Sequence, residues 1–310
     1  MDISTIAPLV SKQVLVMLIL IIAGYVLTKR NIITKQGSSE MSAVLVNLVT
    51  PCVMIRAYHI PFDADKVGNI VMGYGISIGI HIIYALLAYL YFKPLKDKES
   101  ALISRNSAIM SNCGFMGIPL LEASLGNDGV FYGSAYLGVF NIFMWSVVKF
   151  QFERGKEKFS FKSLINPGII GVLTGIAFYV TQIKLPSFVY NAVSFAADLN
   201  TPLAMLVIGS FLARSGILSS LKQLRVYNVL SVKLIFAPLL LLVIMKLLKM
   251  DEVLTLSVIL CAACPTAALV PIFAERYNSD YIYATNITVA STVLSMITIP
   301  LLCFICGYIL

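Results

Sequence analysis

Charged residues are scarce in this sequence. Only 12% of its 310 residues are Asp, Glu, Lys or Arg, whereas about 25% is usual in a soluble domain. Hydrophobic residues make up 59% of the chain, and the mean hydropathy is +0.89. A soluble core of this size would leave much apolar surface in water, so the composition excludes an ordinary soluble protein and predicts an integral membrane protein.

The sequence also lacks a concentrated basic patch, although its net charge is +8. Its Lys and Arg residues are distributed over short gaps between apolar runs, which is the positive-inside pattern of membrane proteins. This distribution disfavours nucleic acid as a partner and indicates the lipid bilayer.

Catalytic and cofactor motifs are absent. The sequence has no GxSxG, HExxH or P-loop motif, and no GxGxxG between a strand and a helix. The CxxC pairs Cys261/Cys264 and Cys303/Cys306 lie inside apolar runs without His or polar neighbours, which disfavours a metal or redox site. We therefore predict no enzyme, no cofactor and no metal.

Ten apolar runs follow one another along the chain. A run of about 20 apolar residues is long enough to span a bilayer as a helix. The runs cover approximately residues 10–29, 40–59, 66–92, 100–124, 128–150, 166–183, 187–213, 226–249, 252–275 and 281–309. The first ends in Lys29-Arg30 rather than in a signal-peptide cleavage site. The pattern predicts an all-α membrane protein with ten transmembrane helices.

Motifs recur between the two halves at nearly one offset. LVTP at Leu48–Pro51 returns as LNTP at Leu199–Pro202, 151 positions later, and Gly24 and Gly175 have the same separation. Pro119 and Pro271 are 152 positions apart, and each is followed nine residues later by Asp. A chance alignment is the alternative to an internal repeat.

An odd number of helices in each half determines the relation between the halves. With five helices per half, the second half must enter the membrane from the opposite side, as in the inverted repeats of many secondary transporters. We expect a first repeat at residues 1–151, a charged cytoplasmic linker at 152–165 and an inverted second repeat at 166–310.

The positions of Lys and Arg orient these helices. Sixteen of the 23 fall in the gaps of one side, and Lys233 lies within a run. The other side holds only Lys12, Arg56, Lys66, Lys184, Lys246 and Lys249. The side with sixteen should be cytoplasmic, which places both termini on the non-cytoplasmic side of the cell membrane (inner or plasma).

Residues that weaken a helix gather in three places of the apolar runs. They are Gly114, Gly117 and Pro119 in the fourth run, Pro265 and Pro271 in the ninth, and Pro51 and Pro202 in the TP pairs. Proline removes a backbone donor, and the freed groups need a neighbour, water or ligand. Simple proline kinks are one interpretation. The matching positions favour discontinuous fourth and ninth helices that cross near the midplane, with helix N-termini directed at an anion.

Polar and helix-breaking residues at these places are the candidate site residues. For substrate binding they are Asn112, Cys113, Gly114, Gly117, Pro119, Pro265, Thr266, Pro271, Asn47 and Asn141. For a coupling ion or proton they are Asp198, Asn200 and Glu122. A carboxylate inside a membrane helix is costly and by default marks a site or a proton relay, although Asp198 would serve H⁺ and Na⁺ equally well. Buried amides and hydroxyls that only bridge helices are the alternative.

Most basic residues near the runs are expected to extend to the membrane interface. Lys233 is the exception that is hardest to explain in this way, because it lies several residues inside the eighth run.

Three segments resemble the auxin efflux carrier family, which includes plant PIN proteins and bacterial carboxylate transporters. SNCGFMGIPLLEASLGNDGVFYGSAYLGVFNIF, residues 111–143, is similar to its fourth and fifth helices. NPGIIGVLTGIAFYV followed by LNTPLAMLVIGSFLA is similar to the start of its second half, and STVLSMITIPLL to its last helix. The long cytoplasmic loop of plant PIN proteins is missing, which favours a short bacterial-type carrier.

This resemblance implies the sodium/proton-antiporter and bile-acid-transporter type of fold, with fourth and ninth helices crossed at prolines. It implies anionic substrates such as auxin, malate or malonate. The match carries Asn112, Gly114, Gly117 and Pro119 to the crossover of the fourth helix. Pro265 and Pro271 bracket that of the ninth, and the sequence does not decide between them.

We therefore predict a secondary active transporter that moves a small organic anion by alternating access. A membrane sensor or receptor on the same scaffold is the alternative, and the missing motifs disfavour an intramembrane enzyme. The expected partners are the anion, H⁺ or Na⁺, the lipid bilayer and a second copy of the chain in a homodimer.

Overall fold

The computed structural model describes residues 6–154 and 166–310, and all structural statements refer to these ranges. Their backbone is almost entirely helical, and the only strand-like feature in them is one isolated pairing. The first part contains α1 (Ile6–Lys29), α2 (Lys35–Val44), η2 (Leu45–Val49), α3 (Thr50–Tyr58), α4 (Ala64–Phe92), α5 (Lys98–Ile109), η3 (Cys113–Gly117), α6 (Ile118–Phe143), η4 (Met144–Val148) and α7 (Lys149–Glu153).

The second part contains the remaining helices. They are α8 (Pro167–Thr181), α9 (Ser187–Asp198), α10 (Asn200–Ser215), α11 (Ile217–Lys222), α12 (Leu224–Ser231), η6 (Val232–Phe236), α13 (Ala237–Leu248), α14 (Glu252–Ala263), α15 (Leu269–Arg276) and α16 (Tyr281–Ile309). The η segments are π-helical turns within longer helices.

Seven helical stretches of the described ranges are long and apolar enough to cross a membrane. They are Ile6–Lys29, Lys35–Tyr58, Ala64–Phe92, Cys113–Glu153, Ser187–Ser215, Leu224–Leu248 and Tyr281–Ile309. α8 and α14 are shorter apolar helices. Large apolar side chains such as Leu86, Ile297 and Phe304 are exposed, as expected of a surface that faces lipid. The prediction of a multi-pass membrane protein is confirmed.

The predicted fourth and fifth runs differ from the observed helices. α6 continues from Ile118 to Phe143, but Gly126 inside it has φ +64° and ψ −152°, so the helix is kinked there. Glycine adopts this conformation without the cost that a Cβ would add. The fourth run is interrupted instead between Ile109 and Cys113, where α5 ends and η3 begins.

The π-helical turns explain how proline is accommodated in the long helices. Four occur in the described ranges, and three of them end two residues before a proline, namely Pro51, Pro119 or Pro238. Proline has no N–H, and its ring clashes with the carbonyl four residues back. A wider turn relieves the clash, since its bonds reach five residues back, as from Ile118 N–H to the Cys113 carbonyl. The helices therefore bulge at these prolines and do not break.

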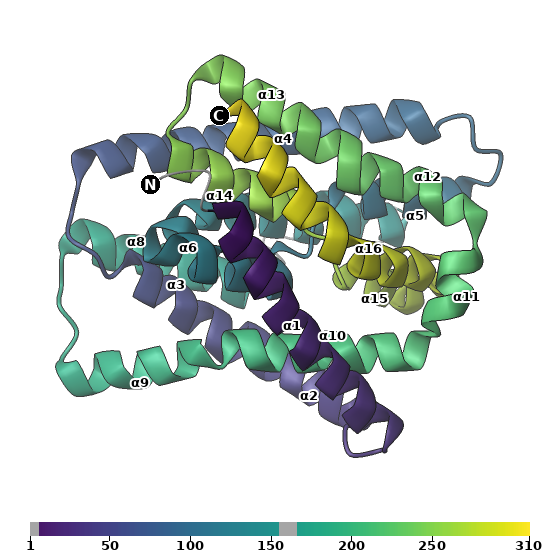
Figure 1. Cartoon of the computed structure of the whole chain (residues 1–310), viewed down its shortest axis with the longest axis horizontal. Helices are drawn as coiled ribbons and strands as arrows, with labels where there is room; N and C mark the ends of the chain where they lie inside the picture. The colour runs from purple at the N-terminus through teal and green to yellow at the C-terminus, as the bar shows by residue number, and fades with distance from the viewer. Residues whose placement is uncertain (1–5, 155–165) are drawn as a thin grey trace.

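Glycines bring two pairs of helices into close contact. α1 crosses over α10, and α8 lies against α3 (Figure 1). A Cβ on Gly24 of α1 would lie 2.5 Å from the carbonyl oxygen of Leu206 on α10. A Cβ on Gly175 of α8 would lie 3.1 Å from the carbonyl oxygen of Met54 on α3. Small residues at such positions let membrane helices approach through their backbones.

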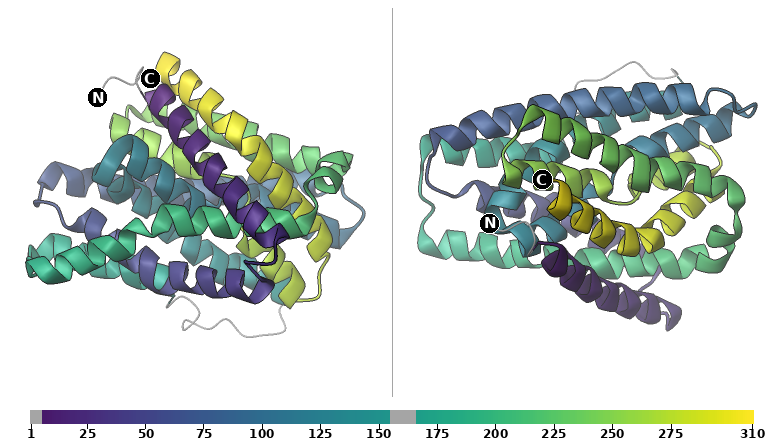
Figure 2. Two further views of the ribbon diagram at one scale, coloured as in Figure 1. Left: turned by 60° about the horizontal axis from the view of Figure 1, so that its bottom comes forward. Right: turned by 45° about the horizontal axis from the view of Figure 1, so that its top comes forward.

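α14 lies in the interior of the helix bundle. Every residue from Leu254 to Ala263 is buried, and α14 packs against α6 on one side and against α16 and α13 on others. Its largely apolar sequence, in which only Thr255 and Ser257 of the buried residues are polar, is typical of a helix without a solvent-facing side. The α9–α10 rod runs along one edge of the molecule, where α1 crosses it (Figure 2). The helix breaks described next border α14 and therefore lie inside the bundle.

Candidate functional site

Two helix breaks lie against each other at the centre of the protein. α5 ends at Ile109, and Met110 is extended, with φ −81° and ψ +118°. α14 ends at Ala263, and Cys264 is extended, with φ −58° and ψ +151°. Ser111 and Thr266 are paired in antiparallel orientation. We call residues 110–112 and 264–268 together the paired break.

Backbone hydrogen bonds hold the paired break together. The N–H of Asn112 donates to the carbonyl of Pro265 at 2.7 Å, and the N–H of Ala267 donates to the carbonyl of Met110 at 3.0 Å. Polar backbone groups released by a break cannot face lipid. Here each break satisfies groups of the other, so neither would be stable in the membrane alone.

Side chains satisfy further ends of the broken helices. The Thr266 hydroxyl donates to the Ser107 carbonyl of α5 at 2.9 Å, and the Ser291 hydroxyl accepts the N–H of Thr266 at 3.1 Å. The Ser111 hydroxyl donates to the Ala262 carbonyl of α14 at 3.0 Å. Thr266 is fully buried, and these bonds give it a structural part in the paired break.

Near the paired break are two buried amides whose side-chain N–H groups include one that donates to no described residue. Asn112 directly precedes η3 and is 8% exposed, and no residue bonds its side chain. Asn200 begins α10, which packs against η3; it is 1% exposed, and its Nδ2 is unpaired. A fully buried donor without a partner, such as Asn200 Nδ2, costs about 1–3 kcal/mol. Both amides are suited to an acceptor that enters from outside the chain.

The candidate glycines and Cys113 differ in how tightly they are packed. A Cβ on Gly117 would lie 3.4 Å from Cys113 Cβ and 3.4 Å from Cys264 Sγ, which is ordinary van der Waals contact. A Cβ on Gly114 would meet only Leu137, at 3.7 Å, and would fit. The cysteines are free, and the described residues contain no group of three or more His, Cys, Asp or Glu that could hold a metal.

The prolines do not all lie where the crossover prediction put them. Pro265 is in the paired break, where its carbonyl accepts from Asn112. Pro119 lies within the continuous helix that begins at η3, and Pro271 is the third residue of α15. Of the two prolines left open for the ninth run, Pro265 therefore lies in the break, and Pro271 lies in the first turn of a helix, which tolerates proline. Pro119 does not mark the break of the fourth run, because the π turn accommodates it.

Asn47 and Asn141 lie away from the paired break. Asn47 is exposed, and its amide donates to the Ala43 carbonyl one turn earlier. Asn141 donates in the same way to Leu137 and packs beside Gly168 at the start of α8. Each amide bonds its own helix, so the structure does not bring either residue to the paired break, and their part in the substrate site stays a prediction.

Two candidate carboxylates belong to an ion cluster on three helices. Arg56 on α3 contacts Glu122 on α6 through one guanidinium nitrogen, and the other lies 2.6 Å from Asp198 Oδ1 at the end of α9. The Asp198 side chain is 65% exposed. Asp198 lies where α9 gives way to α10, inside the apolar stretch Ser187–Ser215, and its part in coupling stays a prediction.

Sequence reasoning left Lys233 out of the site. Its side chain is fully buried, and Nζ donates to the Ser111 hydroxyl and, at 3.1 Å, to the Ala262 carbonyl. The sequence feature that could have indicated its role is its position deep inside an apolar run. Only the structure places its amine on both sides of the paired break.

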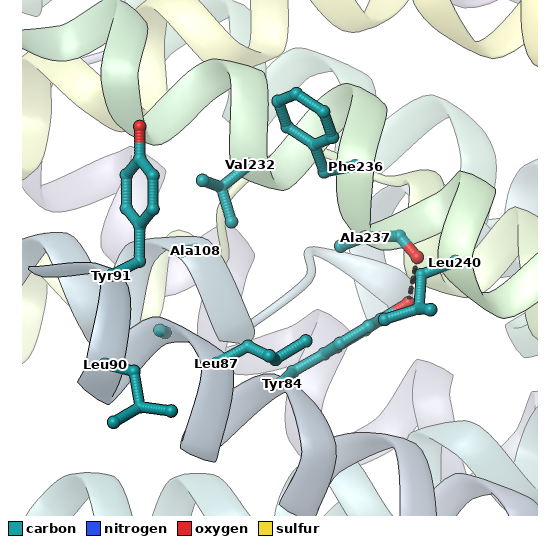
Figure 3. Close-up of a pocket in the computed structure, with 10 residues that line it drawn as sticks. Tyr84, Leu87, Leu90, Tyr91, Ala108, Val232, Phe236, Ala237 and Leu240 are labelled. Atoms are coloured by element: carbon teal, nitrogen blue, oxygen red, sulfur yellow. Dashed lines mark hydrogen bonds between the residues drawn. The ribbon is translucent and has the colours of Figure 1, made fainter.

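An apolar cavity of about 490 Å³ lies between α4, α5, η6 and α13 (Figure 3). Its lining includes Leu87, Leu90 and Phe236, and the Tyr84 hydroxyl at its wall already donates to the Ala237 carbonyl at 2.5 Å. It contains none of the predicted site residues. A small anion would find few polar partners in it, so the paired break is the better candidate site.

Known proteins resemble nearly the whole chain. Residues 9–303 match the family described as membrane transport protein. A protein of Methanothermobacter thermautotrophicus described as an uncharacterized transporter is 21% identical over 297 residues, which cover 94% of this chain and 96% of that protein. The family match spans both sides of the paired break. The chain belongs to this membrane transport protein family, the auxin efflux carrier family that its sequence resembles.

Proposed function

We propose that this protein is a secondary active carrier that moves a small organic anion across the cell membrane by alternating access. The observation that carries the proposal is the unpaired Asn112 amide at the paired break. The first N–H groups of the helix that begins at η3 have no partner within that helix, and a helix N-terminus favours negative charge. An amide adds directional donors there and costs less to bury than a charge.

We further propose that the chain forms ten membrane spans in two inverted repeats, residues 1–151 and 166–310, joined by a linker at 152–165. The kink at Gly126 divides α6 between a fourth and a fifth span, and α14 and α15 form the ninth. The glycine contacts support the repeat. Gly24 approaches Leu206, and Gly175 approaches Met54. Gly175 lies 151 positions after Gly24, and Leu206 lies 152 positions after Met54, so the second contact repeats the first with the halves exchanged.

The orientation and the coupling ion are further parts of the proposal. The distribution of Lys and Arg favours termini on the non-cytoplasmic side. Glu122 and Asp198, which are paired with Arg56, remain with Asn200 the candidate residues for a coupling H⁺ or Na⁺. A homodimer is retained as a prediction.

Uptake into proteoliposomes tests the carrier. Labelled malonate, malate and indole-3-acetate would be offered to wild-type protein, to Asn112→Ala and to the matched control Asn47→Ala. We expect Asn112→Ala to raise the KM about 5- to 150-fold, equivalent to about 1–3 kcal/mol for the lost hydrogen bond. Asn47→Ala should have the wild-type KM because its amide bonds only its own helix.

Two outcomes would contradict these assignments. An unchanged KM in Asn112→Ala would remove Asn112 from the site. Wild-type protein whose melting temperature rises with one of these anions, but which moves none of them, would favour a receptor on the same scaffold.

A further inference from the structure

Lys233 lies beside the candidate anion site and is attached to both of its broken helices. It belongs to η6, and its side chain has no exposed surface. Its Nζ contacts the Ser111 hydroxyl in the paired break and the Ala262 carbonyl in the last turn of α14. The amine is therefore attached to both broken helices.

No carboxylate balances this amine in the part of the chain that the structure describes. Three cations in or at the ends of other apolar helices have carboxylate partners, as the pairs Arg56–Glu122, Lys66–Asp128 and Lys149–Glu153 show. Lys233 takes part in no ion pair among the described residues. A buried cation without an opposite charge is costly, so its position calls for an explanation.

The groups that face Lys233 offer dipoles but no full negative charge. Cys113 and Cys264 approach it from the two sides of the paired break, and His81 approaches it from α4. The Tyr136 hydroxyl lies 3.3 Å from Ser111 Oγ, and the His81 ring lies 4.7 Å from the Tyr136 ring. Thiols and phenols are neutral at neutral pH. The carbonyl end of α14 compensates part of the charge.

We propose that Lys233 is the counter-charge of the transported anion and makes the paired break selective for carboxylates over neutral analogues. This inference rests on the proposed function and adds the residue that sets charge selectivity. The ammonium does not touch the substrate, since it is enclosed. It acts across Ser111 on the neighbouring Asn112 position, where the low dielectric of the interior strengthens its field. Binding of the anion then supplies the negative charge that the described residues lack.

The test compares purified variants by two measurements, the melting temperature without ligand and its rise with malonate, malate or indole-3-acetate. Lys233→Met and Lys233→Gln remove the charge, and Lys233→Arg keeps it. Lys246→Met is the matched control, because Lys246 also donates to a carbonyl, that of Ile309, but is exposed. Uptake of the same three anions into proteoliposomes accompanies each variant.

We expect Lys233→Met to melt at or above the wild-type temperature without ligand, because replacing a buried charge by an apolar residue of similar volume is often neutral or stabilising. Its affinity for the anion should fall at least about tenfold, because the field of a nearby full positive charge in the low-dielectric interior is lost. Lys233→Arg should bind more tightly than either neutral variant, and Lys246→Met should equal wild type. A role limited to holding the helices would instead lower the melting temperature and leave the affinity of the folded protein unchanged.

Three results would overturn the proposal. An unchanged affinity in Lys233→Met would remove the counter-charge while leaving the carrier intact. If neither neutral variant folds while Lys233→Arg does, the charge serves the fold and not the anion. Wild-type protein that neither binds nor moves any of the three anions would overturn the counter-charge and the proposed function together.

Discussion

Arg56 and Glu122 form an ion pair between α3 and α6, two helices that are far apart in the sequence. The same guanidinium also bonds Asp198 at 2.6 Å, so one cation joins α3, α6 and α9. The Arg56 side chain is only 13% exposed. Without it, two carboxylates would face each other with no cation between them.

Replacing Arg56 by Gln should therefore lower stability. We expect a loss of about 1–3 kcal/mol, more than an exposed ion pair contributes, because Glu122 is left partly buried and unpaired. The melting temperature of the purified protein measures this. Lys35→Gln, which breaks the exposed Lys35–Glu275 pair, is the control and should change little. The double variant Arg56→Glu/Glu122→Arg should recover part of the lost stability. The pairing would be refuted if Arg56→Gln left the melting temperature unchanged and the double variant recovered no stability.

The paired break predicts a specific cross-link. Ser111 and Thr266 form a non-hydrogen-bonded antiparallel pair, for which a Cα separation of about 4.5 Å is usual. This lies within the range that a disulfide bridges. After Cys113, Cys261 and Cys264 are replaced by Ala, the double variant Ser111→Cys/Thr266→Cys should form a disulfide under mild oxidation, as measured by mass spectrometry. The pair Asn47→Cys/Thr266→Cys should stay reduced.

Close packing of α1 on α10 predicts unequal effects of two Gly→Ala substitutions. A Cβ on Gly209 would lie 2.1 Å from the carbonyl oxygen of Ile21, whereas a Cβ on Gly68 of α4 would meet nothing within 4 Å. Gly209→Ala should destabilise the protein by about 1–3 kcal/mol, as overpacking does. Gly68→Ala should be neutral or slightly stabilising, since alanine favours a helix. Equal melting temperatures for the two variants would show that α1 and α10 do not approach so closely.

The proposed orientation predicts which side of the membrane each loop faces. Lys222 and Lys184 are both exposed, and the charge distribution puts Lys222 in the cytoplasm and Lys184 outside. Impermeant thiol reagents added to intact cells should label Lys184→Cys and spare Lys222→Cys, in a background without natural cysteines. The reverse pattern would invert the topology. Lys156, which the same argument assigns to the cytoplasm, lies outside the described residues.

The sequence predicts the class of this protein better than the positions of its helix breaks. Apolar composition suffices for the membrane assignment, since it depends on no tertiary contact. The proline positions did not locate the break of the fourth run, because a π turn that ends two residues before a proline accommodates it without breaking the helix, as at Pro119. The break of the fourth run begins at Met110, which has no breaking tendency of its own, whereas Cys264 precedes Pro265, and a residue before proline is disfavoured in a helix. Hydrogen bonds between the breaks stabilise them, and such long-range bonds leave no local signal.

The same limit applies to the charged residues. Arg56 and Lys233 are visible in the sequence as cations near or inside apolar runs, but their partners are distant along the chain. Asn47 shows a different limit, because its place in the repeat does not predict which way its side chain points. Asp198 lies 151 positions after it, at the corresponding place of the second half, yet the Asn47 side chain is exposed. A shared position in a repeat thus indicates a shared place in the chain path and does not determine which way a side chain points.

Each π turn inserts one residue more than an α-helix needs, which shifts the following part of the helix by about 100° relative to an unbroken spiral. η2 gives an example. α2 packs against α10, whereas α3, beyond the wide turn, packs against α8 and α9. One continuous rod thereby changes neighbours part-way along its length. Hydrophobic periodicity measured over the whole rod, Lys35–Tyr58, therefore averages two apolar stripes that are out of phase. The rod has two buried sides in succession, and an average over its length shows neither of them.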